Sequence, residues 1–324
     1  MQSWYFRQRQ ATSRQGAFRS GRINQRGESR TFSPRLFILR EVVFSRLQRF
    51  AFSILPSALR IQGSSYFRNY ALDLRDRIKG ETDPEIPPRH LNISGAGPFR
   101  TFGKNMVDLC RQHASLTPDD VVIDIGCGIG RTALALSNYL NRGEYYGFDI
   151  IEFAIEWCRK HIAERRANFH FVHADVFNLT YNPHGKVKAE RFVFPYADGI
   201  ASFALATSLF THMLPDAVEN YLSQTSRVLK PGGRFLSTWF LLDGTTERAM
   251  SQGKTSLEFK HRFAQHAQVS LHAPEQAVAF PRLDVEKMFE KHGFFIDGNY
   301  SGDWTGISDK KIHSMQDLII AIRR

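Results

Sequence analysis

Short apolar runs alternate with amphipathic stretches through most of the chain. The apolar runs are rich in β-branched and aromatic residues and lie at 121–125, 145–150, 168–174, 200–207 and 235–241, followed by 294–300 and 314–322. Stretches with helical spacing lie at 64–79, 102–113, 132–140, 152–165, 215–229 and 283–292. Runs of this kind are typical of strands buried on both faces, and helices between them would cover those faces. The alternation predicts an α/β fold with a mostly parallel sheet.

A glycine-rich segment follows the first of these strands. Residues 121–131 read VVIDIGCGIGR, so Gly126, Gly128 and Gly130 stand at alternate positions between a strand and a helix. Such a unit presents backbone N–H groups to a ligand, and glycine allows the close approach and the positive φ that a side chain would oppose. The segment predicts a nucleotide-like ligand.

The spacing of the glycines distinguishes two kinds of nucleotide site. The dinucleotide fingerprint is G-x-G-x-x-G, but here Arg131 takes the place of its third glycine and Asp124 stands two residues before the first. An acid at the strand end would repel a pyrophosphate and suits a ligand that carries an ammonium group. At these residues the sequence resembles the class I S-adenosylmethionine-dependent methyltransferases, whose first motif is an acid, one residue and then G-x-G-x-G. An NAD-dependent oxidoreductase on a Rossmann fold is the alternative.

Three further features extend this resemblance over residues 100–242. Asp149 ends the second strand and Asp175 follows the third. The stretch 227–233, RVLKPGG, is similar to the turn that leads into the fifth strand of these methyltransferases. The resemblance implies a three-layer Rossmann-like fold, with a seven-stranded, mostly parallel sheet and a terminal antiparallel hairpin. It also implies S-adenosyl-L-methionine as the cofactor.

The resemblance assigns roles to residues at the strand ends. Asp149 would accept the ribose hydroxyls, and Asp175 would accept the adenine amino group while the next N–H meets the ring. Helix capping and a plain turn are the structural alternatives for these two acids. Cys127 is expected to be a small packing residue and not a nucleophile. The expected cofactor-binding residues are Asp124, Gly126, Cys127, Gly128, Gly130, Asp149, Ile150, Asp175 and Val176.

The end of the fourth strand carries the candidate catalytic residue. The family usually has an aromatic–acid pair near the start of this strand, where this chain has Ala201 and Ser202. His212 follows the strand at the edge where open α/β sheets bind their ligands, and an imidazole can accept a proton near neutral pH. It is the predicted general base, with helix capping or packing against the cofactor as the alternative.

A polar stretch at 243–280 interrupts the pattern and is predicted to be a lid-like insertion over the site. Its histidines at 261, 266 and 272 lack the i, i+4 spacing of a helical metal pair, so no metal site is expected.

The positive charge of the chain is concentrated at its N-terminal end. The net charge is +11, and residues 1–60 hold twelve arginines, no lysine and two acids, whereas the other 264 residues hold 31 basic and 30 acidic side chains. The nearly neutral remainder gives no strong nucleic-acid signal. Residues 1–34 have a composition typical of disorder, and 35–55 form a basic amphipathic pattern. The three interpretations are docking of 35–55 on the domain, contact of 35–55 with a membrane surface, and a targeting peptide within 1–60.

These patterns and the resemblance to the class I methyltransferases together predict three regions and imply a function. The regions are an Arg-rich arm at 1–60, a helix and Pro-rich linker at 61–93, and a methyltransferase domain at 94–324. Three cysteines without a framework spacing, and no apolar run of ~18 residues, favour a cytoplasmic protein. The expected reaction is methyl transfer to oxygen or nitrogen of a small polar molecule by in-line displacement. A protein or nucleic-acid substrate recruited by the arm is the further alternative, and the sequence does not indicate the oligomeric state.

Overall fold

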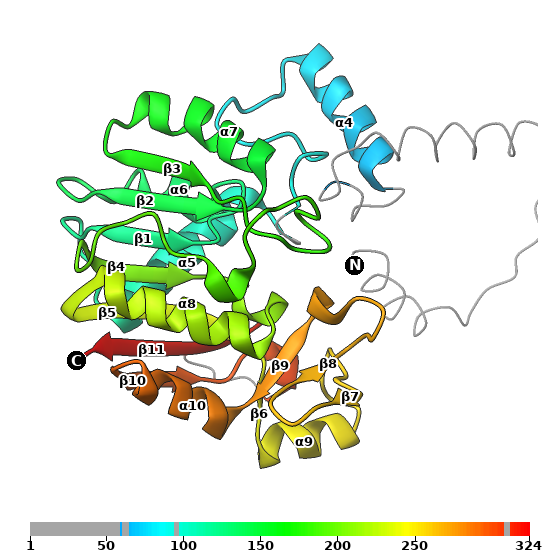
Figure 1. Ribbon diagram of the computed structural model, residues 1–324. Helices are drawn as coiled ribbons and strands as arrows, with labels where there is room; N and C mark the ends of the chain where they lie inside the picture. The colour runs from blue at the N-terminus through cyan, green and yellow to red at the C-terminus, as the bar shows by residue number, and fades with distance from the viewer. Residues whose placement is uncertain (1–58, 60–64, 94–96, 308–311) are drawn as a thin grey trace, which may run out of the picture.

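A seven-stranded sheet forms the centre of the computed structural model, which describes residues 59, 65–93, 97–307 and 312–324 (Figure 1). The segment 35–55 and the interpretations attached to it lie outside the described residues. The strand order is β10-β11-β5-β4-β1-β2-β3. These strands are β1 Val122–Ile125, β2 Tyr145–Asp149, β3 Phe169–His173, β4 Ala201–Ala206, β5 Leu229–Trp239, β10 Phe294–Tyr300 and β11 Asp317–Arg323.

The pairing of these strands confirms the predicted fold class. Strands β3, β2, β1, β4 and β5 pair in parallel, whereas β11 is antiparallel to both β5 and β10. The parallel strands therefore end at one edge, called here the carboxyl edge, and begin at the opposite amino edge. Connections that leave the carboxyl edge are the ones expected to carry the site.

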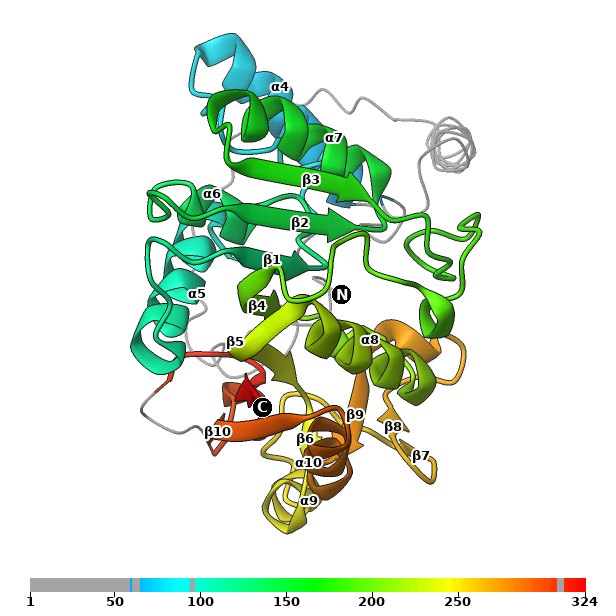
Figure 2. The ribbon, with the colours of Figure 1, turned by 60° about the vertical axis from the view of Figure 1, so that its left-hand side comes forward.

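Helices cover both faces of the sheet (Figure 2). Two separate apolar cores lie between the helices and the sheet. Along β1, Val122 packs with one core and Ile123 with the other, because successive side chains of a strand point to opposite faces. One face is covered by α5 Phe99–Ala114, α6 Arg131–Leu136 and α7 Glu152–His161. The other is covered by α8 Pro215–Val228 and α10 Arg282–Lys291.

The helix after the glycine segment is shorter than predicted. It ends at Leu136, whereas the apolar spacing predicted a helix to residue 140. The side chains of Ser137 and Asn138 both donate to the Leu134 carbonyl, at 2.8 and 3.2 Å. Such bonds compete with the backbone N–H groups that would continue the helix. The prediction followed the apolar residues and missed this competition.

The fifth strand begins earlier than predicted, because the KPGG turn lies within it. Leu229 already pairs with Ala201, and the register shifts before Phe203 pairs with Arg234. Gly232 has a φ of 77° in this irregularity. The predicted turn is therefore present as a break in the strand register.

The stretch 243–280 is folded and has its own apolar cluster. It contributes β7, β8, β9 and α9, and β6-β9-β8-β7 form a second small sheet. Phe240, Phe259 and Trp304 are the large side chains of the cluster. The elements are β6 Leu241–Leu242, α9 Gly244–Ser251, β7 His261–Arg262, β8 Ala267–Gln268, η4 Pro274–Gln276 and β9 Val278–Pro281.

One helix stands outside these layers. Helix α4, Ser65–Lys79, lies beside α7 at the β3 end of the sheet in both ribbon views (Figures 1 and 2). Within the part of the chain that the structure describes, no helix is long and apolar enough to cross a membrane.

Candidate active site

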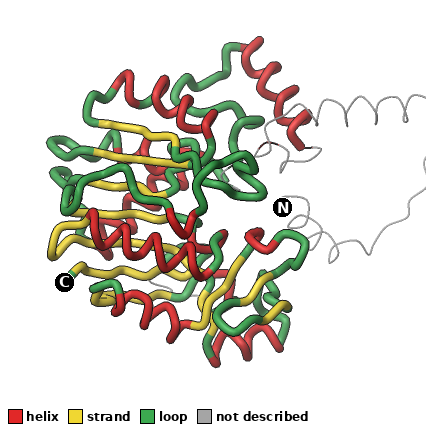
Figure 3. The backbone as a smooth tube through the Cα atoms, in the orientation of Figure 1, coloured by secondary structure: helices red, strands yellow, loops and turns green. Residues whose placement is uncertain are grey.

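The motif residues of four strands meet along the carboxyl edge of the sheet. The neighbouring strands β4, β1, β2 and β3 all end there, so the segments at 126–130, 149–150, 175–176 and 208–212 follow adjacent strands. Much of the chain between β3 and β4 is loop on this side of the molecule (Figure 3). The topology therefore brings the predicted site residues to one region.

The glycine segment requires glycine for two physical reasons. Gly126, Gly128 and Gly130 all have positive φ, at 77°, 55° and 82°. A Cβ on Gly130 would also lie 2.8 Å from both Cys158 Sγ and Ile162 Cδ1, so this glycine lets the loop pack against α7. Glycine is thus demanded by backbone conformation and by packing together.

In a dinucleotide fingerprint, the third glycine permits close packing of the helix that follows. In this chain, a glycine of a different helix, α5, permits the close packing. Arg131 occupies the third fingerprint position, and its guanidinium lies 3.7 Å above the ring centroid of Phe102. Burial lowers the pKa of Arg131 to about 10. On α5, a Cβ at Gly103 would lie 2.1 Å from the Arg131 carbonyl oxygen, so Gly103 permits the close approach of α5 and α6.

Asp124 lies beneath the glycine segment and not on its surface. Its side chain is buried, with the residue only 1% exposed, and Oδ2 accepts a hydrogen bond from the Tyr145 hydroxyl at 2.8 Å. Oδ1 has no hydrogen-bond partner among the described residues. Burial raises the pKa of Asp124 to about 7, and the charge of Asp149 adds to the rise. The carboxyl group therefore titrates near neutrality and would ionise more readily beside a cation.

Asp149 joins the second strand to the glycine segment. Oδ2 accepts the Gly128 N–H at 2.7 Å and Oδ1 accepts the Ile151 N–H at 2.9 Å. Burial raises the pKa of this carboxyl group, and the backbone N–H bonds oppose the rise. The N-cap of α7 is Ile151, so Asp149 is not the N-cap residue, although its carboxylate accepts the N–H of that residue. Each oxygen keeps a lone pair that a ligand hydroxyl could use.

The residues next to Asp149 and Gly128 are buried or half-buried. Cys127 and Cys158 are buried, and burial raises the pKa of both thiols. Cys127 is therefore a packing residue, as predicted, because a neutral buried thiol is a poor nucleophile. Ile150 is half-buried, and its carbonyl accepts a hydrogen bond from His173 Nε2 at 3.2 Å.

Asp175 and Val176 begin a loop that folds back on itself. The Asp175 carboxylate lies 3.5 Å from Lys186 Nζ, and its carbonyl accepts the N–H groups of Lys186 and Val187. The N–H of Val176 donates to the Ala174 carbonyl at 2.7 Å. The Val176 N–H was expected to contact the adenine ring of the cofactor. Cofactor binding would therefore require this N–H to share its hydrogen bond with the ring or to exchange the Ala174 carbonyl for the ring.

His212 is held as a neutral imidazole. It ends the short helix η3, Phe210–His212, and its Nδ1 lies 2.9 Å from the Glu275 carbonyl oxygen. A carbonyl only accepts, so Nδ1 carries the proton and Nε2 keeps its lone pair. Burial lowers the pKa of His212, which keeps the ring neutral. A neutral imidazole with a lone pair on Nε2 can accept a proton.

The insertion contacts the site through a residue that the sequence did not single out. Glu275 orients His212 with its carbonyl, and its Oε2 accepts a hydrogen bond from Asn178 Nδ2 at 2.9 Å. Burial raises the pKa of the Glu275 carboxyl group. The histidines at 261, 266 and 272 belong to no group of potential metal ligands within the described ranges.

A strained serine and a glutamine form a polar network at the end of β4. Ser208 has a φ of 54°, which non-glycine residues adopt only at a cost. Its hydroxyl donates to Gln316 Oε1 at 3.0 Å, and Thr238 donates to the same oxygen at 2.7 Å. Gln316 Nε2 reaches Thr211 Oγ1 at 3.3 Å. Only the position of Ser208 after a strand was visible in the sequence, because Gln316 lies 108 residues away.

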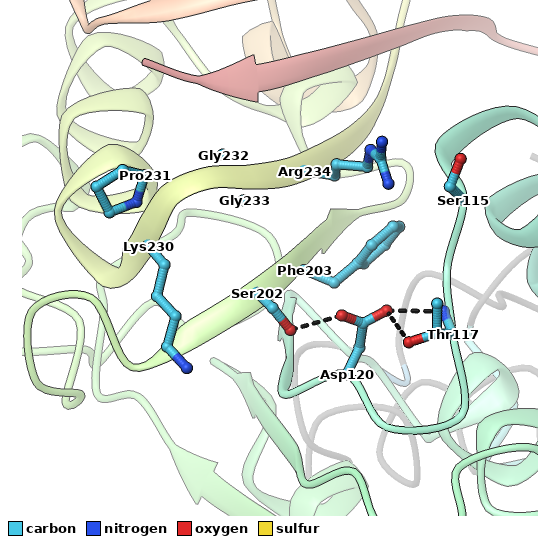
Figure 4. A pocket seen from close by; sticks show the side chains of 10 residues that line it. All are labelled: Ser115, Thr117, Asp120, Ser202, Phe203, Lys230, Pro231, Gly232, Gly233 and Arg234. Carbon is cyan, nitrogen blue, oxygen red and sulfur yellow. Dashed lines mark hydrogen bonds between the residues drawn. The ribbon is translucent and has the colours of Figure 1, made fainter.

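A cavity of about 240 Å³ lies at the other, amino edge of the sheet (Figure 4). Lys230, Gly232 and Arg234 line it beside the start of β4. At its floor Asp120 accepts hydrogen bonds from Ser202 Oγ at 2.6 Å and from the Thr117 N–H and hydroxyl at 2.7 and 2.9 Å. These bonds connect the strand starts, and we assign the site to the carboxyl edge, where the motif residues converge.

Comparison with known proteins agrees with this geometry. A family profile described as "Methyltransferase domain" matches residues 116–293. Fatty-acid O-methyltransferase of Mycolicibacterium smegmatis is 25% identical over 158 residues, which are 48% of this chain and 49% of that protein. Methyltransferase GfsG of Streptomyces halstedii is 26% identical over 157 residues, 48% of this chain and 50% of that protein. The chain thus matches about half the length of each.

The fold is shared with a solved structure. The PH0226 protein from Pyrococcus horikoshii OT3 superposes with a TM-score of 0.51 and 17% identity, over 74% of this chain and 97% of that one.

Proposed function

Because the chain belongs to the class I S-adenosylmethionine-dependent methyltransferases, we propose that its carboxyl-edge site binds S-adenosyl-L-methionine and methylates oxygen or nitrogen of a small polar molecule. The chain is an enzyme of this class. The family match is to a methyltransferase domain and gives no support to the alternative of an NAD-dependent oxidoreductase. The observation that carries the proposal is the bond from the Gly128 N–H to Asp149, which joins the acid to the glycine segment.

The residues at the carboxyl edge fit this cofactor. Asp149 has remaining lone pairs for the ribose hydroxyls. Gly126 and Gly128 have no side chains that would block the approach of the cofactor to the backbone beside Asp149. Asp124 Oδ1 is a buried acceptor without a partner in the described part of the chain, which suits the ammonium group of the cofactor directly or through water. When bound, the sulfonium supplies an electrophilic methyl group, so the protein has only to position the acceptor and remove its proton.

His212 is the residue that we propose removes the proton. Its Nε2 has the lone pair, and the Glu275 carbonyl fixes the ring through Nδ1. Its lowered pKa keeps it unprotonated at neutral pH. Gln316, held by Ser208 and Thr238, is placed to orient a polar group of the acceptor at the same edge.

The proposed acceptor class rests on charge and on the insertion. Residues 61–324 are almost neutral, which gives a polyanionic substrate no electrostatic attraction. The contact of Glu275 with His212 puts the insertion next to the base, as a lid over a small molecule would require. The name of one curated relative, a fatty-acid O-methyltransferase, supports oxygen as the acceptor atom.

The test is a methyl-transfer assay with labelled cofactor on fractionated cell extract, with the product identified by mass. We expect label in a small molecule, and we expect His212→Gln to reduce its formation while the affinity for S-adenosylhomocysteine stays unchanged. Label confined to protein or nucleic acid would contradict the proposed acceptor class. Equal rates for wild type and His212→Gln would remove His212 from the reaction.

A further inference from the structure

Helix α4 exposes a line of apolar side chains. Tyr70, Leu74 and Ile78 stand four residues apart and are 51%, 51% and 79% exposed. At 3.6 residues per turn this spacing places them along one stripe of the helix surface. An exposed stripe of this kind on a helix outside the core layers indicates a contact with something other than the sheet.

The acidic residues of α4 face away from solvent and are neutralised. Asp73 accepts from His90 Nδ1 at 2.8 Å and forms an ion pair with Arg89 at 3.1 Å. Asp76 is buried and pairs with Arg89 at 2.6 Å and with Arg75 at 2.8 Å. The charge that remains on the outer surface of α4 is therefore positive.

Basic side chains flank the apolar stripe on both sides. Helical periodicity places Arg77 next to Tyr70 along one side of the stripe and Arg68 on the other side. Arg68 and Arg77 are exposed. An apolar stripe between arginines is the pattern of helices that lie in the plane of a membrane interface.

The segment after α4 fixes this helix to the domain. Arg100 of α5 pairs with Asp83 at 2.7 Å and with Glu85 at 2.8 Å. His161 of α7 is 2.9 Å from the Pro84 carbonyl oxygen. The segment that follows α4 is thus bound to both α5 and α7. A surface that docks on the stripe would therefore have a defined orientation relative to the domain.

We propose that the outer face of α4 docks on an anionic lipid surface. Three side chains on one helix are far too small for a stable protein interface, which buries about 800 Å² on each partner. A lipid surface requires only shallow apolar insertion together with attraction of basic residues for anionic headgroups. The arm at 1–60, with twelve arginines against two acids, precedes α4 in the sequence. The proposal rests on α4 and does not depend on the acceptor of the methyl group.

The first test is co-sedimentation of the full chain with phosphatidylcholine vesicles, with and without phosphatidylglycerol. We expect binding only to the vesicles that contain phosphatidylglycerol. Leu74→Glu/Ile78→Glu should weaken that binding about tenfold or more, because two inserted side chains are lost. The matched control is Leu283→Glu/Phe295→Glu, which adds the same charge at two residues that are 68% and 52% exposed on α10 and β10. The control should lose much less affinity.

A second measurement keeps the test decisive if the double variant folds poorly. All three native cysteines are buried, so a polarity-sensitive fluorophore can be attached selectively to Leu74→Cys or Leu283→Cys. We expect a blue shift on adding anionic vesicles for the label at 74 and none for the label at 283. Calorimetry with S-adenosylhomocysteine verifies that each variant keeps its site.

Three results would overturn the proposal. One is the absence of vesicle binding by the wild type. Another is equal binding by the α4 and control variants without a shift at position 74, which would leave the arm as the membrane contact. The third is a change of oligomeric state in the α4 variant with vesicle binding unaltered, which would assign the stripe to a second copy of the chain.

Discussion

Each edge of the central sheet has an aspartate next to β1, and the two carboxyl groups differ in their hydrogen bonding. At the amino edge, the Asp120 carboxylate accepts hydrogen bonds from Thr117 and Ser202 on both oxygens. At the carboxyl edge, Asp124 is more deeply buried, yet one of its oxygens is satisfied only by Tyr145 and the other has no partner among the described residues. Folding alone favours the first arrangement. The contrast shows that Asp120 connects neighbouring segments of the chain, and it is the basis for the proposed ligand-binding role of Asp124.

The largest expected effect is a dependence of the free energy of unfolding on pH that comes from Asp124. The pKa of Asp124 is raised to about 7 from 3.8, so the unfolded chain loses this proton first as the pH rises between these values. Stability therefore falls through this window, by as much as about 4 kcal/mol, and no further above it. Asp124→Asn should abolish that fall and raise the free energy of unfolding at neutral pH, as measured by urea denaturation across the window.

Asp120→Asn is the matched control for this measurement. It should lower the free energy of unfolding at neutral pH by about 1–3 kcal/mol, because the amide replaces an acceptor with a donor. If the two substitutions destabilise the protein equally at neutral pH, the proposed difference between the edges is wrong.

A smaller difference is expected between two glycines that share the same backbone conformation. Gly130 and Gly232 have φ values of 82° and 77°, but a Cβ would clash at Gly130 and meet nothing within 4 Å at Gly232. Gly232→Ala should cost about 1–2 kcal/mol for the left-handed conformation. Gly130→Ala should cost about 2–3 kcal/mol more through overpacking and should also weaken cofactor binding. Equal losses in urea denaturation would show that the loop yields to the added methyl group.

The smallest effect concerns two serines with positive φ. Ser115 ends α5 at the amino edge with a φ of 50°, and Ser208 follows β4 with a φ of 54°. Ser115→Gly should stabilise the protein by about 1 kcal/mol and leave methyl transfer unchanged. Ser208→Gly should leave stability almost unchanged, since relief of strain offsets the lost bond to Gln316, but should reduce labelling of the acceptor. Unchanged labelling would make Ser208 a structural residue like Ser115.

Local patterns predicted the α/β class with a mostly parallel sheet, and the resemblance to the class I methyltransferases implied its seven strands and the antiparallel hairpin. Buried apolar runs located the parallel strands, and each motif acid stood at a strand end, where parallel topology must bring the ends together. The expectation that Cys127 is a packing residue came from the resemblance to the family. The folded core of the insertion was not predicted, because Phe240 and Trp304 that complete it lie outside 243–280.

The contacts that orient the site could not be predicted, because they join residues far apart in the chain. Glu275 orients His212 through its backbone carbonyl, which no side-chain pattern records. The bond from the Gly128 N–H to Asp149 and the contact of Ser208 with Gln316 depend on how strands and loops are placed in space. Helix α6 is shorter than its apolar spacing predicted for a local reason, the competing side chains of Ser137 and Asn138.

Calorimetry with S-adenosylhomocysteine tests the central claim, that Asp149 and the glycine segment form the cofactor site. The wild type should give saturable heat with S-adenosylhomocysteine and none with NAD. Asp149→Asn should raise the Kd about tenfold to a hundredfold, because charge-assisted bonds to the ribose are weakened, while Asp120→Asn should leave it unchanged. A urea transition verifies that both variants fold. An unchanged Kd for folded Asp149→Asn, or heat with NAD alone, would contradict the account.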